Sequence, residues 1–260
     1  TKFDAGNSKA GSLSEFGLNN TTADSLIVDG ISYTFPIGNF TAFVGDTVDG
    51  GSLFTIACAY GGPSDTLDDC GNVNANIGKG GKTNAGLSTE FGSGFSTAIG
   101  YSGYSTGIMT EESLDQYAIN GAYTGENYGV SLTYALVESS TTEEDAFTAL
   151  NAYYTPEGNF PSISVGYEIG DIGGAAANVD EKESLFLGLT WDEVGPGSLG
   201  LALGHVDTLE GDEEEYMYEA YYDYPVNDGM TITPLIYVKE KSNPGADDTT
   251  GVMVKTSFKF

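Results

Sequence analysis

Apolar and polar residues alternate along most of this sequence, and the alternation is clearest at its end. In residues 249–260, one set of alternate positions holds Val252, Val254, Thr256, Phe258 and Phe260. The other set holds Met253, Lys255, Ser257 and Lys259. Successive side chains of a β-strand point to opposite faces, so the pattern predicts a terminal strand with one apolar and one polar face. Such a strand leaves an open edge, which a barrel removes by pairing the last strand with the first.

The same alternation recurs upstream in twelve segments that turn residues separate. They are residues 26–35, 40–48, 83–91, 95–101, 116–123, 128–137, 147–154, 162–169, 184–191, 198–206, 216–224 and 230–240. With a short opening strand at about 1–7 and the terminal strand, the sequence predicts about fourteen strands, or sixteen in the full protein.

The connections between these segments alternate in length. Short turns, such as residues 36–39 and 195–197, alternate with long acidic connections. The long connections are at about 8–24, 49–82, 102–115, 138–146, 170–183, 207–215 and 241–249. In an up-and-down barrel, alternate connections lie on the same rim. We therefore predict that residues 1–260 form a single antiparallel up-and-down transmembrane β-barrel, with short periplasmic turns and longer acidic external loops.

The two faces of the predicted strands differ in side-chain type. Val130, Leu132 and Tyr134 alternate with Ser131 and Thr133, and the later strands repeat this pattern. A water-filled lumen tolerates small polar residues, whereas a soluble sandwich usually carries Lys, Arg and Glu on its solvent face. Aromatic residues also lie next to the short turns, as expected for a girdle at a membrane interface. The alternative for these aromatics is that they close the end of a soluble barrel.

Composition and charge exclude several other classes of protein. No apolar run approaches the ~18 residues that a transmembrane helix needs. The chain has 38 acidic residues against nine basic ones and a formal charge of −29. Nucleic acid is therefore excluded as a partner, because phosphate binding depends on Lys and Arg. The acidic connections are interpreted as solubilising loops, and loosely bound divalent cations there are the alternative. No other cofactor is expected.

The sequence gives little support for catalysis. Residues 103–107 match the G-x-S-x-G pattern, but no strand-to-helix elbow surrounds them. His205 is the only histidine, and it lies in an apolar segment where packing is the simpler role. No phosphate-binding, dinucleotide-binding or His/Cys metal motif is present. We therefore predict that the protein is not an enzyme.

The longest connection, residues 49–82, contains the two cysteines of the chain. Cys58 and Cys70 are expected to form a disulfide in an oxidising compartment. In a channel, a long loop can fold into the lumen, where charged side chains select among ions. Asp65, Asp68 and Asp69 are candidate constriction carboxylates on that hypothesis. A cap on the outer rim is the interpretation that the sequence favours.

Charged residues on the polar face of the strands are further candidates for the pore lining. The acidic candidates are Asp29, Glu90, Glu168, Asp192, Glu219 and Asp223, and the basic ones are Lys239, Lys255 and Lys259. The alternative is that several of them are rim or turn residues. Because acids outnumber bases, the field should favour cations, and the lysines on the last two strands would form one basic wall.

Three stretches resemble the cyanobacterial outer-membrane porins, which are related to the carbohydrate-selective porin family. They are residues 29–45 (DGISYTFPIGNFTAFVG), 228–234 (DGMTITP) and 251–260 (GVMVKTSFKF). The resemblance implies a passive channel in the outer membrane, commonly a homotrimer, for inorganic ions and small solutes, including sugars or iron. It also implies an N-terminal surface-layer-homology domain that binds peptidoglycan. The chain starts at Thr1 without that domain or a signal peptide, so we expect a processed or truncated piece.

The terminal strand is expected to contain the signal for barrel closure, in Gly251, Phe258 and Phe260. Two competing classes stay open at this point. One is a plugged structural or receptor barrel that tethers the envelope, and the other is a soluble acidic β-sandwich that binds a ligand. Conductance separates the first from a porin, and independence from detergent identifies the second.

Overall fold

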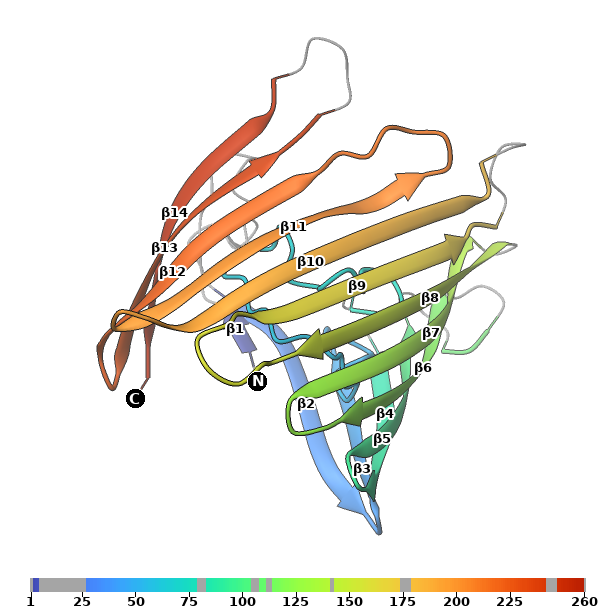
Figure 1. Cartoon of the computed structure of the whole chain (residues 1–260). Helices are drawn as coiled ribbons and strands as arrows, with labels where there is room; N and C mark the ends of the chain where they lie inside the picture. The colour runs from blue at the N-terminus through green and yellow to red at the C-terminus, as the bar shows by residue number, and fades with distance from the viewer. Residues whose placement is uncertain are drawn as a thin grey trace.

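The computed structural model describes residues 2–4, 27–78, 83–103, 108–110, 114–140, 143–173, 179–241 and 247–259. These residues form fourteen strands in a single antiparallel sheet (Figure 1). The strands are β1 (Lys2–Asp4), β2 (Ile27–Ile37), β3 (Phe40–Asp46), β4 (Thr83–Gly92), β5 (Phe95–Gly103), β6 (Asp115–Thr124), β7 (Tyr128–Ser140), β8 (Glu143–Tyr154), β9 (Ser162–Asp171), β10 (Glu181–Val194), β11 (Gly197–Leu209), β12 (Met217–Asn227), β13 (Met230–Lys239) and β14 (Thr249–Phe258). Within the described part of the chain, no helix is long and apolar enough to cross a membrane.

Each strand pairs with its neighbour in the sequence, so the order in the sheet is β1 to β14. The sheet curls strongly, and the short turns that follow β2, β4, β6, β8, β10 and β12 lie at one rim (Figure 1). The prediction of an all-β, up-and-down antiparallel fold of about fourteen strands is therefore confirmed. Among the described residues, the hydrogen-bonded order ends at β1 on one side and at β14 on the other.

Several strands continue into segments that were predicted as connections, and residues 138–146 differ most from the prediction. The acidic segment 138–146 was expected to be a loop, but β7 and β8 continue through most of it, with Val137 paired to Asp145 and Glu138 to Glu144. Two hydrogen bonds to Asp145 help to hold this acidic segment in place. The Asp145 carboxylate accepts bonds from the Ser139 hydroxyl (3.2 Å) and the Gly173 N–H (2.9 Å).

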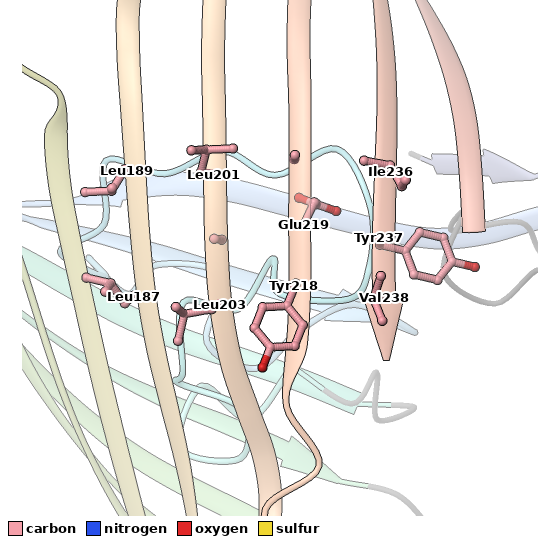
Figure 2. A pocket seen from close by; sticks show the side chains of 11 residues that line it. Leu187, Leu189, Leu201, Leu203, Tyr218, Glu219, Ile236, Tyr237 and Val238 are labelled. Carbon is pink, nitrogen blue, oxygen red and sulfur yellow. The ribbon is translucent and has the colours of Figure 1, made fainter. Parts of the chain in front are cut away.

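The outer face of the sheet is apolar and exposed. In β9, the side chains alternate strictly between buried and exposed, and the exposed ones are Ile163, Val165, Tyr167 and Ile169, ending with Asp171. Across β10 to β13, leucine, isoleucine, valine and tyrosine side chains line a shallow hollow of about 430 Å³ on this face (Figure 2). At the short-turn rim, Phe91 is 69% exposed and Phe160 is 75% exposed, in agreement with an aromatic girdle.

On β7 to β9 the inner face carries the small polar residues that were predicted, whereas β10 and β12 also place the large side chains of Phe186 and Tyr221 on it. Ser131, Thr133, Asn151 and Ser164 are each at most 1% exposed, because another part of the chain covers them. That part is the connection between β3 and β4, which passes inside the curl of the sheet as the cyan trace in Figure 1. Small side chains at these positions therefore make room for the loop.

Candidate functional site

The connection between β3 and β4, called here the inner loop, is described from Thr47 to Gly78. Its backbone follows the inner face of the sheet from strand to strand. The N–H of Thr55 donates to Asn120 Oδ1 (3.0 Å), and that of Ala57 donates to Ser131 Oγ (2.9 Å). The N–H of Ala59 donates to Ser164 Oγ (2.8 Å). The expectation of a cap on the outer rim is therefore wrong, because polar wall side chains bind the loop backbone inside the sheet.

A disulfide between Cys58 and Cys70 joins the two arms of the inner loop. The residues between them pack against the inner face of the later strands. Tyr60, Leu67 and Cys70 form a buried apolar cluster with wall side chains that include Phe186, Met217 and Tyr221. The Tyr60 ring lies 5.4 Å from the ring of Phe186 and 5.6 Å from that of Tyr221. Hydrophobic burial therefore holds this part of the loop on β10 to β13.

Glycines on the wall permit this close approach. A Cβ atom added to Gly166 of β9 would lie 1.8 Å from the carbonyl oxygen of Cys70, and one added to Gly100 of β5 would lie 2.4 Å from that of Gly50. A Cβ at Gly188 would lie 2.9 Å from the Cβ of Tyr60. Any larger residue at these three positions would push the inner loop away from the wall.

Two wall carboxylates bind the inner loop directly. Glu168 of β9 accepts hydrogen bonds from the N–H of Asn74 (2.9 Å), the side-chain amide of Asn74 (2.9 Å) and the N–H of Ala75 (2.8 Å). Glu219 of β12 accepts hydrogen bonds from the hydroxyls of Tyr60 (2.7 Å) and Ser64. Both glutamates were predicted to lie on the polar face, and both do so. Hydrogen bonds to a charged acceptor contribute about 1.5–3 kcal/mol each.

A charged network next to Glu168 involves two residues that the sequence analysis did not identify. Lys182 forms a 2.9 Å salt bridge with Asp207, and its ammonium lies 4.9 Å from the centre of the Phe147 ring. Asp207 also accepts a hydrogen bond from the Asn74 amide (2.7 Å). Both residues lie in segments predicted as loops, whereas β10 and β11 continue through them. A longer estimate of these strands would have placed Lys182 on the polar face.

The three candidate constriction carboxylates all lie on the inner loop, inside the disulfide ring. Asp65, Asp68 and Asp69 are exposed, and with Lys239 of β13 they line a cavity of about 310 Å³. Acidic loop residues and a basic wall residue therefore face the same space. Protein atoms around the Asp69 carboxyl group partly desolvate it although the residue as a whole is exposed, and this desolvation, together with the charge of Asp68, raises the pKa of that carboxyl to about 7.

The structure separates the remaining pore candidates. Glu90 of β4 is exposed and lines a hollow of about 370 Å³ with Thr55 and Ser96 at the short-turn end. The Asp223 carboxylate accepts a hydrogen bond from Thr233, which pairs with Lys255 across β13 and β14. These contacts place Asp223 and Lys255 on the inner face.

Other candidates lie near the ends of strands or outside the described residues. Asp192 is exposed beside a bulge of β10, and Lys259 follows β14, where its N–H donates to Gly229. Asp29 is in β2, but its side chain is not among those that the structure describes. Of the closure residues, Gly251 lies against the Tyr237 ring and Phe258 is 60% exposed, whereas Phe260 lies outside the described residues.

The described part of the chain places no catalytic partner next to His205 and no group of metal ligands together. His205 is buried, with Nδ1 2.8 Å from the Thr208 hydroxyl and its ring edge against Tyr216. Most of the G-x-S-x-G match, residues 104–107, lies outside the described residues. Among those residues, no group of three His, Cys, Asp or Glu side chains is placed to hold a metal ion.

Comparison with known proteins identifies the fold. No model of a known protein family matches the sequence, and no curated protein matches it. Among solved structures, a triple variant of the Rhodopseudomonas blastica porin matches with a TM-score of 0.64 and 12% identity, covering 93% of this chain and 80% of that one. A second porin structure matches with a TM-score of 0.60 and 18% identity, covering 88% and 80%. The chain therefore has the fold of a porin β-barrel.

Proposed function

We propose that this protein is an outer-membrane porin, a water-filled channel for passive diffusion of inorganic ions and small hydrophilic solutes, including sugars or iron. The observation that carries the proposal is the inner loop, which the wall of a porin-type sheet holds inside the curl. A loop in this place would narrow the path through the interior of the barrel. Diffusion through such a channel needs neither catalysis nor an energy source.

The charges that face the remaining space support a preference for cations. Asp65, Asp68 and Asp69 project from the inner loop, and Lys239 faces them from the wall. The whole chain has 38 acidic and nine basic residues, so acidic groups dominate the field around any path. Rings of carboxylates attract cations and repel anions.

The proposal extends to the setting of the channel. The apolar outer face and the aromatic rim fit membrane lipid as the surrounding medium. On the resemblance of residues 29–45, 228–234 and 251–260, we further propose a porin of the cyanobacterial type. Such a protein would assemble as a homotrimer and reach peptidoglycan through an N-terminal domain outside these 260 residues. Divalent cations held loosely by the acidic loops are also part of the proposal.

One observation favours a second candidate, a plugged structural or receptor barrel. The inner loop buries Tyr60 and Leu67 in an apolar cluster on β10 to β13, which fills part of the interior. A single curled sheet does not favour the third possibility, a soluble sandwich, which requires two packed sheets.

Single-channel recording in a planar bilayer with a KCl gradient tests the proposal. We expect stable ohmic steps and a reversal potential that favours K⁺, because carboxylates dominate the interior. Silence from protein that is shown to be inserted would replace the porin by the plugged barrel. Failure to insert into detergent micelles or lipid would refute both.

A further inference from the structure

Glu168 and Glu219 are more deeply buried than the other acidic wall candidates whose side chains the structure describes. Glu168 is 2% exposed and Glu219 is 4% exposed, whereas Glu90 and Asp192 are exposed on the wall. A solute in the interior therefore does not reach either buried carboxylate. Their partners are groups of the inner loop instead.

The donors that the described part of the inner loop presents to Glu168 are N–H groups. Both carboxylate oxygens accept bonds there, from the N–H groups of Asn74 and Ala75 and from the Asn74 side-chain amide. An N–H group cannot reverse its role and become an acceptor. The site therefore requires an acceptor at both oxygen positions of residue 168.

Glu219 meets a different kind of donor. Its two oxygens accept bonds from the hydroxyls of Tyr60 and Ser64. A hydroxyl both donates and accepts, and it rotates to suit its partner. The Ser64 oxygen already accepts a bond from the N–H of Thr66 (3.2 Å), which shows that this hydroxyl serves both roles.

The two carboxylates bind the inner loop on either side of its acidic segment. Glu219 holds Tyr60 and Ser64, which precede Asp65, and Glu168 holds Asn74 and Ala75, which follow Asp69. The disulfide between Cys58 and Cys70 limits how far the segment between them can move. Because the chain is held on both sides of residues 65–69, the position of this acidic segment is fixed as well.

We infer that Glu168 and Glu219 are positioning residues: they set where the acidic segment 65–69 stands in the channel, and they act on permeating ions only through that segment. The inference rests on the proposed channel function. It gives the two glutamates a role distinct from that of the exposed carboxylates, which contribute charge to the path directly.

Three glutamine substitutions that remove the same charge test this inference. In Glu168→Gln, the new NH₂ group faces N–H donors, so we expect the loop at Asn74 and Ala75 to leave the wall. The open channel should then lose its single stable current level and switch among several sublevels. In Glu219→Gln, the hydroxyls of Tyr60 and Ser64 reorient, so the stable level should persist, whereas Glu219→Ala should lose it. Glu90→Gln is the matched control, and it should alter the reversal potential without adding sublevels.

Hydrogen exchange supplies a readout that does not depend on conductance. We expect Glu168→Gln to lose protection in a peptide that contains Asn74 and Ala75, while peptides from β7 and β9 keep theirs. If Glu168→Gln does not assemble, Ala75→Pro removes one donor from the loop side and should give the same sublevels.

The outcomes separate this inference from the proposed function. Wild-type currents and wild-type protection in Glu168→Gln, or equal effects of all three glutamine substitutions, would overturn the positioning role. An inserted wild-type protein that passes no current would instead overturn the porin proposal, and the exchange experiment would still decide whether Glu168 holds the loop.

Discussion

At the scale of single residues, Asp69 provides a pH-dependent element in the proposed channel. Its pKa is raised to about 7, first by desolvation of the carboxyl group and then by the charge of Asp68. A carboxyl is neutral below its pKa and charged above it, so Asp69 loses its charge as the pH falls through about 7.

We therefore expect cation selectivity to decrease as the pH falls through about 7, because one carboxylate near the path becomes neutral. Reversal potentials measured in a KCl gradient on both sides of that pH give the test. The variant Asp69→Asn should show the low-pH selectivity throughout and a flatter pH dependence. An unchanged pH profile in this variant would assign the titration to another group.

Residue positions on the two faces were largely predictable, but their partners were not. Strand alternation places Glu168 and Glu219 on the inner face, and the structure agrees. Their burial depends on a loop more than 90 positions away in the sequence, which alternation does not reveal. Lys182 and Asp207 were missed because an acidic, turn-rich end of a strand is hard to distinguish from a loop.

At the scale of elements, the strands follow from the sequence and the inner loop does not. All fourteen predicted strands are present, and most differ from the prediction only at their ends. A period-two pattern is local, so it survives without knowledge of the rest of the chain. The path of residues 47–78 is set by contacts with β6, β7, β9 and β12, and no local pattern contains that information.

The approach of the inner loop to β9 makes Gly166 a sensitive position. In Gly166→Ala, the new Cβ would lie 1.8 Å from the Cys70 oxygen and 2.7 Å from Asn151 Nδ2, which itself donates to that oxygen (2.7 Å). We expect the loop to shift and the thermal stability to fall, at a cost of about 1–3 kcal/mol for overpacking. Conductance and thermal melting in detergent measure the two effects.

Gly121→Ala is the matched control for this substitution. A Cβ at Gly121 meets nothing within 4 Å, and the residue pairs with Thr97 and Leu132 on adjacent strands. It should melt and conduct like the wild type. Equal effects of the two alanines would mean that the close approach at Gly166 does not constrain the loop.

At the scale of the whole molecule, the apolar outer face predicts how the protein responds to a charge. Leu201 lies in the middle of β11 and lines the hollow of Figure 2. If this face contacts lipid, Leu201→Lys should destabilise the protein in vesicles. We expect its free energy of unfolding to fall by about 2–4 kcal/mol, as for a lysine at the bilayer midplane. Urea titration of the protein in lipid vesicles gives this value.

A lysine at the long-connection rim serves as the control. Glu210 is exposed just beyond β11, so Glu210→Lys should change the folding free energy by only about 0–1 kcal/mol, the value near an interface. A tolerated lysine at Leu201 would contradict the membrane-spanning assignment and return attention to a soluble protein.

The position of the inner loop on the inner face also limits the order in which parts of the chain can fold. Neighbouring strands form hairpins, so the sheet can grow through contacts that are close in sequence. Tyr60 finds its partner Glu219 only 159 positions later, on β12. The inner loop comes early in the sequence, but its contacts with β12 can form only after nearly all of the sheet has formed. Binding of the inner loop to the inner face of β12 is therefore a late folding step. Until it occurs, the strands that have already paired surround an interior that the loop does not yet fill.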